Sequence, residues 1–181
     1  MSRIPTPASI EAAPEAARPL LEAVNKQLGV VPNLFRLVAT SPATLEGFLG
    51  LSGALGKGKL NLATREGIAL AVAQANGCGY CLAAHTYIGA NMAKQSAEEL
   101  ALNRRGSSGN AKEAAAIGFA LAIVQKRGQV SEAEIAAVRA AGYSDAELLE
   151  IVAHTALNTL TNYINEVFAT DIDFPTVALA A

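Results

Sequence analysis

Three copies of one helix-start pattern constrain the fold of this chain more than any other feature. In each copy a serine is followed three residues later by a glutamate: Ser96 with Glu99, Ser131 with Glu134, and Ser144 with Glu147. In such a capping box, the serine hydroxyl and the glutamate carboxylate satisfy free backbone N–H groups at the start of a helix. Roughly a fifth of the residues are alanine, the strongest helix former. We therefore predict an all-α protein.

The length and charge of the chain limit what it can be. A chain of 181 residues is long enough for one domain with a sizeable core. We expect that domain to span residues 1–181, with an extended arm over 1–8 and a non-helical tail over 170–181. A net charge of −2 without a basic stripe argues against a nucleic-acid partner. The longest uncharged apolar run, 114–124, is too short to span a bilayer, and the N-terminus lacks a signal-peptide pattern. We expect no membrane association and a cytoplasmic location.

Periodicity and capping signals predict where the other helices lie. The expected elements are a broken helix from near Ser9 to Leu28, a short helix over 34–39 capped by Asn33, a helix from Pro42 to about Leu55, a helix capped by Thr64 that ends at Asn76-Gly77, a helix to about Lys94, a helix over 111–126 capped by Asn110, and a last helix from Asp145 to about Phe168.

Residues Gly53 to Lys59 match most of a phosphate-binding P-loop, in which backbone N–H groups cradle a phosphate. However, Leu60 occupies the position of the hydroxyl residue that would hold magnesium, and no strand pattern precedes the segment. We interpret it instead as a flexible connection between two helices.

The stretch from Glu66 to His85 holds both cysteines and one of the two histidines. Cys78 and Cys81 are three residues apart and His85 follows after four, so all three share one face of a helix. If the preceding helix folds back at Gly77, His85 lies about 12 Å from the turn and Glu66 about 16 Å along the other helix. We therefore predict that the Glu66 carboxylate approaches His85.

Two considerations disagree about which thiol is the more reactive. A cysteine in the first turn of a helix has its pKa lowered by the amide dipoles, which favours Cys78. A histidine one turn away can take the thiol proton, which favours Cys81. A C-x-x-C pair can also close a disulfide after one thiol is oxidised to sulfenic acid. Half of a zinc site is the alternative, but a closed site would need His154 or a carboxylate as well. We expect no metal and no cofactor.

These residues also carry a resemblance. Glu66, Cys78-Gly79-Tyr80-Cys81 and His85, at these spacings, resemble the signature of the alkylhydroperoxidase D branch of the carboxymuconolactone decarboxylase superfamily. Flanking segments resemble its peroxidase-related subgroup: Val31-Pro32-Asn33-Leu34-Phe35, Ser41-Pro42 and Asp173-Phe174-Pro175. The resemblance implies an alkylhydroperoxidase D-like helical bundle that assembles into homo-oligomers, either trimers or larger rings such as hexamers.

The resemblance also implies a reaction, the reduction of a hydroperoxide. Cys81 would be the attacking thiolate and Cys78 the resolving cysteine, with His85 and Glu66 as the proton relay. Regeneration would need a dithiol reductant such as a lipoylated or thioredoxin-like protein. Some members carry a second histidine between the cysteines, where this chain has Gly79-Tyr80, so a shorter relay is expected here.

Other interpretations stay open at this point. One is a lyase or isomerase of the same superfamily that uses Glu66 and His85 for proton transfer, although decarboxylases of that kind lack the cysteine pair. Another is a non-enzymatic oligomer whose cysteines sense oxidants. A polar row on the last helix could line a pocket, form a subunit contact or be half-solvated: Glu150, His154, Asn158 and Asn162.

Overall fold

The computed structural model describes residues 2–178, and every regular element in that range is helical. The prediction of an all-α fold is confirmed. None of these helices combines the length and hydropathy that crossing a bilayer requires. The elements are η1 Glu15–Ala17, α1 Arg18–Leu28, α2 Asn33–Val38, α3 Pro42–Leu55, α4 Leu62–Ala75, α5 Gly79–Asn91, α6 Ala97–Arg104, α7 Ala111–Gln125, α8 Glu132–Ala140 and α9 Asp145–Phe168.

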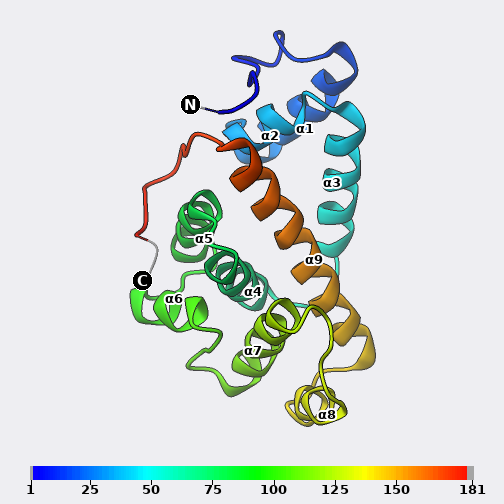
Figure 1. Ribbon diagram of the computed structural model, residues 1–181, viewed down its shortest axis with the longest axis vertical. Coiled ribbons are helices and arrows are strands. Elements are labelled where there is room, and N and C mark those ends of the chain that lie inside the picture. Colours follow the sequence, from blue (N-terminus) through cyan, green and yellow to red (C-terminus); the bar gives the residue numbers. More distant parts are fainter. Residues whose placement is uncertain (1, 179–181) are drawn as a thin grey trace.

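Helix α9 is the longest element and crosses the molecule between two groups of helices (Figure 1). Helices α1 and α2 lie near its C-terminal end and α3 runs beside it, whereas α4 to α7 form the other group (Figure 1). Helix α4 is the centre of that second group, because it packs against α5, α6, α7 and α9. An element surrounded in this way buries every side chain along most of its length, and α4 does so from Glu66 to Ala73.

Small residues let the neighbours of α4 approach closely. Ala69, Ala71 and Ala73 are all buried. A Cβ atom added at Gly67 would lie 2.3 Å from Cδ1 of Ile117 on α7, so only glycine fits there without displacement of the Ile117 side chain. Glu66 therefore precedes a position at which α4 packs closely against the Ile117 side chain of α7.

The core divides into two clusters. The first joins α1, α2, α3 and α5 with part of α9, and it contains Leu21, Leu45, Leu82 and both cysteines. The second joins α4, α7, α8 and α9 around Ile68, Ile117 and Ile151. The cysteine pair is thus part of a packed apolar region and not of a surface loop.

Most helix starts agree with the expected caps. The capping boxes at Ser131 and Ser144 are complete, with both reciprocal hydrogen bonds present. At Ser96 the hydroxyl caps the N–H of Glu99 as expected. The Glu99 carboxylate instead accepts a hydrogen bond from the backbone of Gly109, at 2.9 Å.

Four expected boundaries were wrong. The first helical turn begins at Glu15 and not near Ser9, because Pro14 adopts an extended conformation. Helix α4 is capped by Asn61, not Thr64, since the Asn61 side chain accepts from the Thr64 N–H at 2.8 Å. Helix α2 includes Asn33 as its first residue and not as its cap. Helix α5 ends at Asn91, and Lys94 is already in the left-handed region with φ of 57°.

The P-loop-like segment begins in the last turn of α3, and its remainder, from Gly56, lies in the predicted connection between α3 and α4. Its backbone N–H groups at Lys59 and Leu60 bind the carboxylate of Glu150 on α9, at 2.8 and 3.1 Å. A Cβ atom at Gly58 would lie 2.6 Å from that carboxylate. The glycine therefore gives access to an internal carboxylate, where a P-loop glycine gives access to a phosphate.

The arm and the tail both lie along the body of the molecule (Figure 1). The arm is held where Arg3 donates to the backbone oxygens of Phe168 and Val167 at the end of α9. The tail runs past α5 to α6, where Arg104 donates to the oxygen of Ala178 at 2.7 Å. Residue 1 of the expected arm and residues 179–181 of the expected tail lie outside the described residues.

Candidate active site

The two cysteines occupy different positions at the start of α5. Cys78 is the N-cap, and its sulfur accepts a hydrogen bond from the backbone N–H of Cys81 at 3.4 Å. Cys81 is the third residue of the helix, so it lies in the first turn. Both thiols are free and buried. The positive end of the helix dipole therefore acts on both sulfurs, and it does not by itself distinguish them.

Glu66 and His85 meet across the contact between α4 and α5. Oε2 of Glu66 lies 2.8 Å from Nδ1 of His85, and both side chains are largely buried. The predicted approach of these two residues is confirmed. Burial disfavours the charged imidazole, but the Glu66 carboxylate and Cys81 raise the pKa of His85 above its usual value.

The electrostatic environment separates the two thiols. A hydrogen bond from the Cys78 thiol, together with the charge of His85 and the amides of Asn165 and Asn162, lowers the pKa of Cys81 to about 6, although burial opposes this. The same sulfur–sulfur hydrogen bond and burial raise the pKa of Cys78. At neutral pH the geometry thus favours a thiolate on Cys81 beside a neutral thiol on Cys78.

A cavity of about 340 Å³ adjoins this group of side chains. Glu66, Cys81 and His85 all line it, whereas Cys78 is not among its lining residues. Its other walls are mainly apolar and come from α1, α2, α3, α5, α9 and the tail, with Leu34, Phe35, Phe48, Leu157 and Phe174 among them. Only one of the two thiols, Cys81, therefore faces the space that a substrate could occupy.

Tyr80, which lies between the two cysteines in the sequence, holds the tail against this cavity. Its hydroxyl donates to Oδ1 of Asp173 at 2.8 Å and accepts from the N–H of Leu34 at 3.2 Å. Its ring packs edge-to-face against Phe174, with centroids 5.8 Å apart. Burial and the Asp173 carboxylate raise the pKa of Tyr80. The hydroxyl is thus engaged with the tail and not with the Glu66–His85 pair.

Sequence reasoning missed Asn165, whose Nδ2 donates to Sγ of Cys81 at 3.3 Å. The polar row on α9 is the nearest sequence signal, but it was defined at steps of four and ends at Asn162. Asn165 follows three residues later and was therefore left out. Members of that row have separate roles. Asn158 lines the cavity, and Glu150 binds the 58–60 connection. His154 is buried outside the cavity lining, and burial lowers its pKa.

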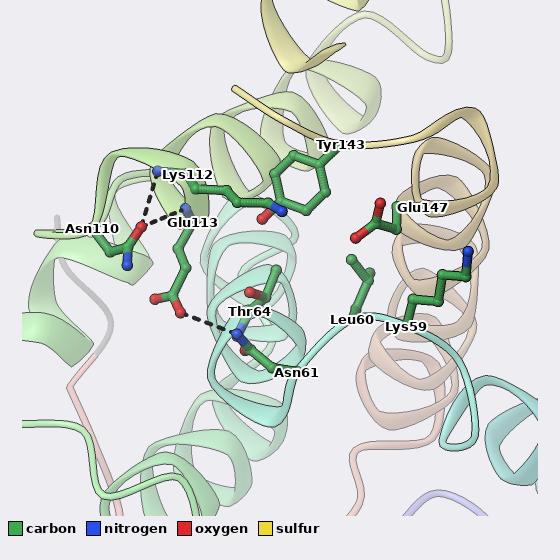
Figure 2. Close-up of a pocket in the computed structure, with 9 residues that line it drawn as sticks. All are labelled: Lys59, Leu60, Asn61, Thr64, Asn110, Lys112, Glu113, Tyr143 and Glu147. Carbon is green, nitrogen blue, oxygen red and sulfur yellow. Dashed lines mark hydrogen bonds between the residues drawn. The ribbon is translucent and has the colours of Figure 1, made fainter. Parts of the chain in front are cut away.

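A second, smaller pocket of about 140 Å³ lies at the N-termini of α4 and α7 (Figure 2). Figure 2 shows two helix caps in its wall: Asn110 binds the backbone of Lys112 and Glu113, and Asn61 reaches the Glu113 carboxylate. It contains none of the predicted site residues. Within residues 2–178, no three histidine, cysteine, aspartate or glutamate side chains are grouped so as to hold a metal ion.

Comparison with known proteins places this constellation in a family. The sequence profile described as "CMD: Carboxymuconolactone decarboxylase family" matches residues 42–122, which include Glu66, both cysteines and His85. A crystal structure described as an alkylhydroperoxidase AhpD core, an uncharacterized peroxidase-related protein from Ralstonia eutropha JMP134, is 30% identical. The match covers 95% of this chain and 92% of that one, with a TM-score of 0.84. The chain belongs to the AhpD-like/carboxymuconolactone decarboxylase superfamily.

More distant structures share the AhpD-like fold. A peroxidase-related protein from Silicibacter sp. TM1040 is 24% identical over 98% of this chain and 92% of that one, with a TM-score of 0.81. A cysteine-to-alanine variant of the debrominase Bmp8, in complex with 2,3,4-tribromopyrrole, is 22% identical over 96% and 94%, with a TM-score of 0.78. No curated protein sequence matches the chain significantly. The family and the helical fold predicted from the sequence are confirmed.

Proposed function

We propose that this AhpD-like protein is a thiol-dependent peroxidase that reduces hydroperoxides through a Cys78–Cys81 disulfide cycle. The observation that carries the proposal is the position of Cys81. It is the thiol with a pKa lowered to about 6, and it is the one that lines the cavity beside the Glu66–His85 pair. The thiolate is the nucleophilic form of cysteine, so this arrangement supports Cys81 as the attacking residue.

In the first step the Cys81 thiolate attacks the terminal oxygen of the hydroperoxide. A sulfur–oxygen bond forms and the oxygen–oxygen bond breaks, so that Cys81 becomes a sulfenic acid and an alkoxide leaves. The alkoxide takes a proton from the imidazolium form of His85, which the Glu66 carboxylate stabilises. The products are the sulfenic acid and an alcohol.

In the second step Cys78 resolves the sulfenic acid. Conversion of Cys81 to the sulfenic acid removes the neighbouring negative charge that contributes to the raised pKa of Cys78. As Cys78 gives up its proton, its sulfur attacks Cys81, so that a sulfur–sulfur bond forms and the sulfur–oxygen bond breaks. The now neutral His85 can relay that proton to the leaving hydroxide, which departs as water. Two cysteines three residues apart at a helix start are close enough for the resulting disulfide.

The cycle closes when an external dithiol reduces the disulfide to two thiols. A lipoylated or thioredoxin-like protein in a reducing compartment such as the cytoplasm is the kind of donor proposed here. The cavity opens beside Cys81, so we expect the donor thiol to attack that sulfur first.

Steady-state turnover tests this function. With dihydrolipoamide as the donor, the parent protein should consume an organic hydroperoxide, whereas Cys81→Ser and Cys78→Ser should not turn over. Disulfide formation without turnover on any dithiol donor would instead support a redox sensor. Activity on a lactone that survives Cys81→Ser would support the lyase or isomerase alternative, which needs only Glu66 and His85.

A second candidate function is reductive removal of a halogen from an aromatic ring. It is favoured by the apolar cavity, whose walls include Phe35, Phe48 and Phe174, and by the likeness of the fold to a debrominase crystallised with a brominated pyrrole. The same cysteine pair would supply two electrons and end as a disulfide. Bromide release from 2,3,4-tribromopyrrole in the presence of a dithiol measures this activity directly.

We also propose that the protein is a homo-oligomer, a trimer or hexamer as the family resemblance implies. Support comes from a row of exposed apolar side chains on α9: Leu149, Val152, Leu160, Tyr163 and Val167. With Ile123 and Val124 of α7, part of this row lines a groove of about 510 Å³. Light scattering of the parent and of Leu160→Asp tests the proposal, because a charge in a self-contact should dissociate the assembly.

A further inference from the structure

Asn165 is a buried amide whose side chain is committed to the reactive sulfur. It is 2% exposed, and its Nδ2 donates to Sγ of Cys81 at 3.3 Å. Its Oδ1 has no hydrogen-bond partner among the described residues.

Asn103 on α6 is also a buried asparagine, but its side chain is fully hydrogen-bonded. With its amide nitrogen facing Glu99 and Ser107, that buried asparagine bonds to both of them and to Gln95. Because burying an amide costs free energy unless it is hydrogen-bonded, a residue with one bond, to sulfur, suggests a role in chemistry and not in folding.

A second amide, Asn162, lies one turn earlier on α9 and is completely buried. Its Oδ1 accepts a hydrogen bond from Nδ2 of Asn76 at 2.9 Å. This bond fixes which end of the Asn162 amide is nitrogen. That nitrogen, Nδ2, has no hydrogen-bond partner among the described residues, although the amide contributes to the lowered pKa of Cys81. Asn76 belongs to the turn between α4 and α5, so that turn orients an amide on a helix far away in the sequence.

Neither amide lines the cavity, whereas Cys81 does. Asn165 therefore contacts the sulfur from the interior of the protein, whereas the substrate would approach it from the cavity. Amide N–H groups fixed around an anionic atom stabilise that anion, and they do so most strongly in a site without water. A neutral thiol gains much less from the same donors, so the equilibrium shifts towards the thiolate.

We infer that the amide N–H of Asn165 stabilises the Cys81 thiolate, and that the unpartnered Nδ2 of Asn162 adds to this effect. Asn76 is then a positioning residue that acts through Asn162. This inference deepens the proposed function, because it assumes that Cys81 is the reacting thiol. The amides favour the thiolate form of Cys81 before any substrate binds. Glu66 and His85 transfer the proton during the reaction.

The test measures Cys81 in a Cys78→Ser background, where it is the single thiol and the serine hydroxyl can still donate to it. The rate of alkylation by iodoacetamide is recorded against pH, and its midpoint reports the Cys81 ionisation. Asn165→Leu removes the donor and should move the midpoint upward by about one pH unit. Asn165→Asp places a carboxylate beside the sulfur and should move it further. Asn76→Ala should give a smaller shift in the same direction.

Asn103→Leu is the matched control, since it also replaces a buried asparagine but lies away from the sulfur. It should lower thermal stability and leave the alkylation midpoint unchanged. If Asn165→Leu does not fold, the isosteric Asn165→Asp decides. The inference is overturned if the Asn165 variants share the midpoint of the parent, or if Asn103→Leu shifts it equally.

The alkylation assay uses no hydroperoxide, so its result is independent of whether the proposed peroxidase activity exists. Where that activity is present, Asn165→Leu should lose about tenfold in kcat near pH 6 and recover at higher pH as the thiolate forms, with little change in KM. A loss that alkaline pH does not restore would instead indicate a structural role.

Discussion

The carboxylate of Glu66 lies 2.8 Å from Nδ1 of His85, and the two residues come from consecutive helices. A carboxylate at Nδ1 holds the proton on that nitrogen and orients the ring. It also stabilises the imidazolium form, which in turn favours a thiolate on Cys81. Through His85, the Glu66 carboxylate thus affects the reactivity of the Cys81 sulfur without contacting it.

Glu66→Gln should weaken this link without removing the side chain. Without the carboxylate charge, the pKa of His85 falls, and the Cys81 thiolate loses part of its positive neighbour. We expect the Cys81 alkylation midpoint to rise and the hydroperoxide rate at neutral pH to fall about tenfold. Stopped-flow measurement of hydroperoxide reduction gives the rate.

Glu150→Gln is the control for that variant, because Glu150 is a structural carboxylate outside the cavity. It should reduce stability and leave the alkylation midpoint in place. Equal midpoints for Glu66→Gln and the parent would contradict an influence of Glu66 on the thiol.

The pH dependence of Cys81 follows from the direction of its shift. Its pKa is lowered to about 6, so the thiolate fraction rises through that pH and is nearly complete at neutral pH. Alkylation of Cys81 should therefore increase between about pH 5 and 7 and then level off. Mass spectrometry that localises the label should find Cys78 unmodified over this range, since its pKa is raised. Preferential labelling of Cys78 would contradict the assignment of the thiolate to Cys81.

Much of this geometry could be predicted from local sequence. Counting 1.5 Å per residue from the turn at Gly77 places Glu66 and His85 at similar depths, and the structure brings them together. Capping residues such as Ser144 and Asn110 mark helix starts through bonds that span only a few residues. In both cases the determining interactions are local or depend on a single turn.

Contacts between segments that are distant in the sequence could not be predicted in this way. Asn165 and Cys81 are 84 positions apart, and no local pattern shows that α9 passes the first turn of α5. The docking of Asp173 on Tyr80 likewise depends on the path of the tail, although the family resemblance had singled out that segment. The Thr64 cap was wrong because α4 begins one turn earlier: Asn61 accepts the N–H of Thr64, which places Thr64 inside the first turn.

Gly58→Ala tests the role assigned to the P-loop-like segment. The new Cβ would lie 2.6 Å from the Glu150 carboxylate, which must shift and weaken its bonds to Lys59 and Leu60. We expect a loss of about 1–3 kcal/mol in the free energy of unfolding, measured with urea. Gly53→Ala is the control, because its Cβ would meet no atom within 4 Å. Similar losses in both variants would mean that the Glu150 contact is not the cause.

Tyr80→Phe should loosen the tail where it covers the cavity. The substitution removes the hydroxyl that joins Leu34 to Asp173 but keeps the ring that packs on Phe174. Faster amide hydrogen exchange at residues 171–174 is the expected result, whereas Tyr163→Phe, on an exposed face of α9, should leave exchange there unchanged. Unchanged exchange in Tyr80→Phe would show that other contacts suffice to hold the tail.

Intact-protein and peptide mass spectrometry after one equivalent of an organic hydroperoxide tests whether Cys81 is the attacking thiol and Cys78 the resolving one. The parent should form a disulfide between Cys78 and Cys81. The Cys78→Ser variant should accumulate a sulfenic acid on Cys81, trapped with dimedone, because no resolving thiol is present. If both thiols of the parent stay reduced, or if Cys81→Ser carries the sulfenic acid on Cys78 instead, the account is contradicted.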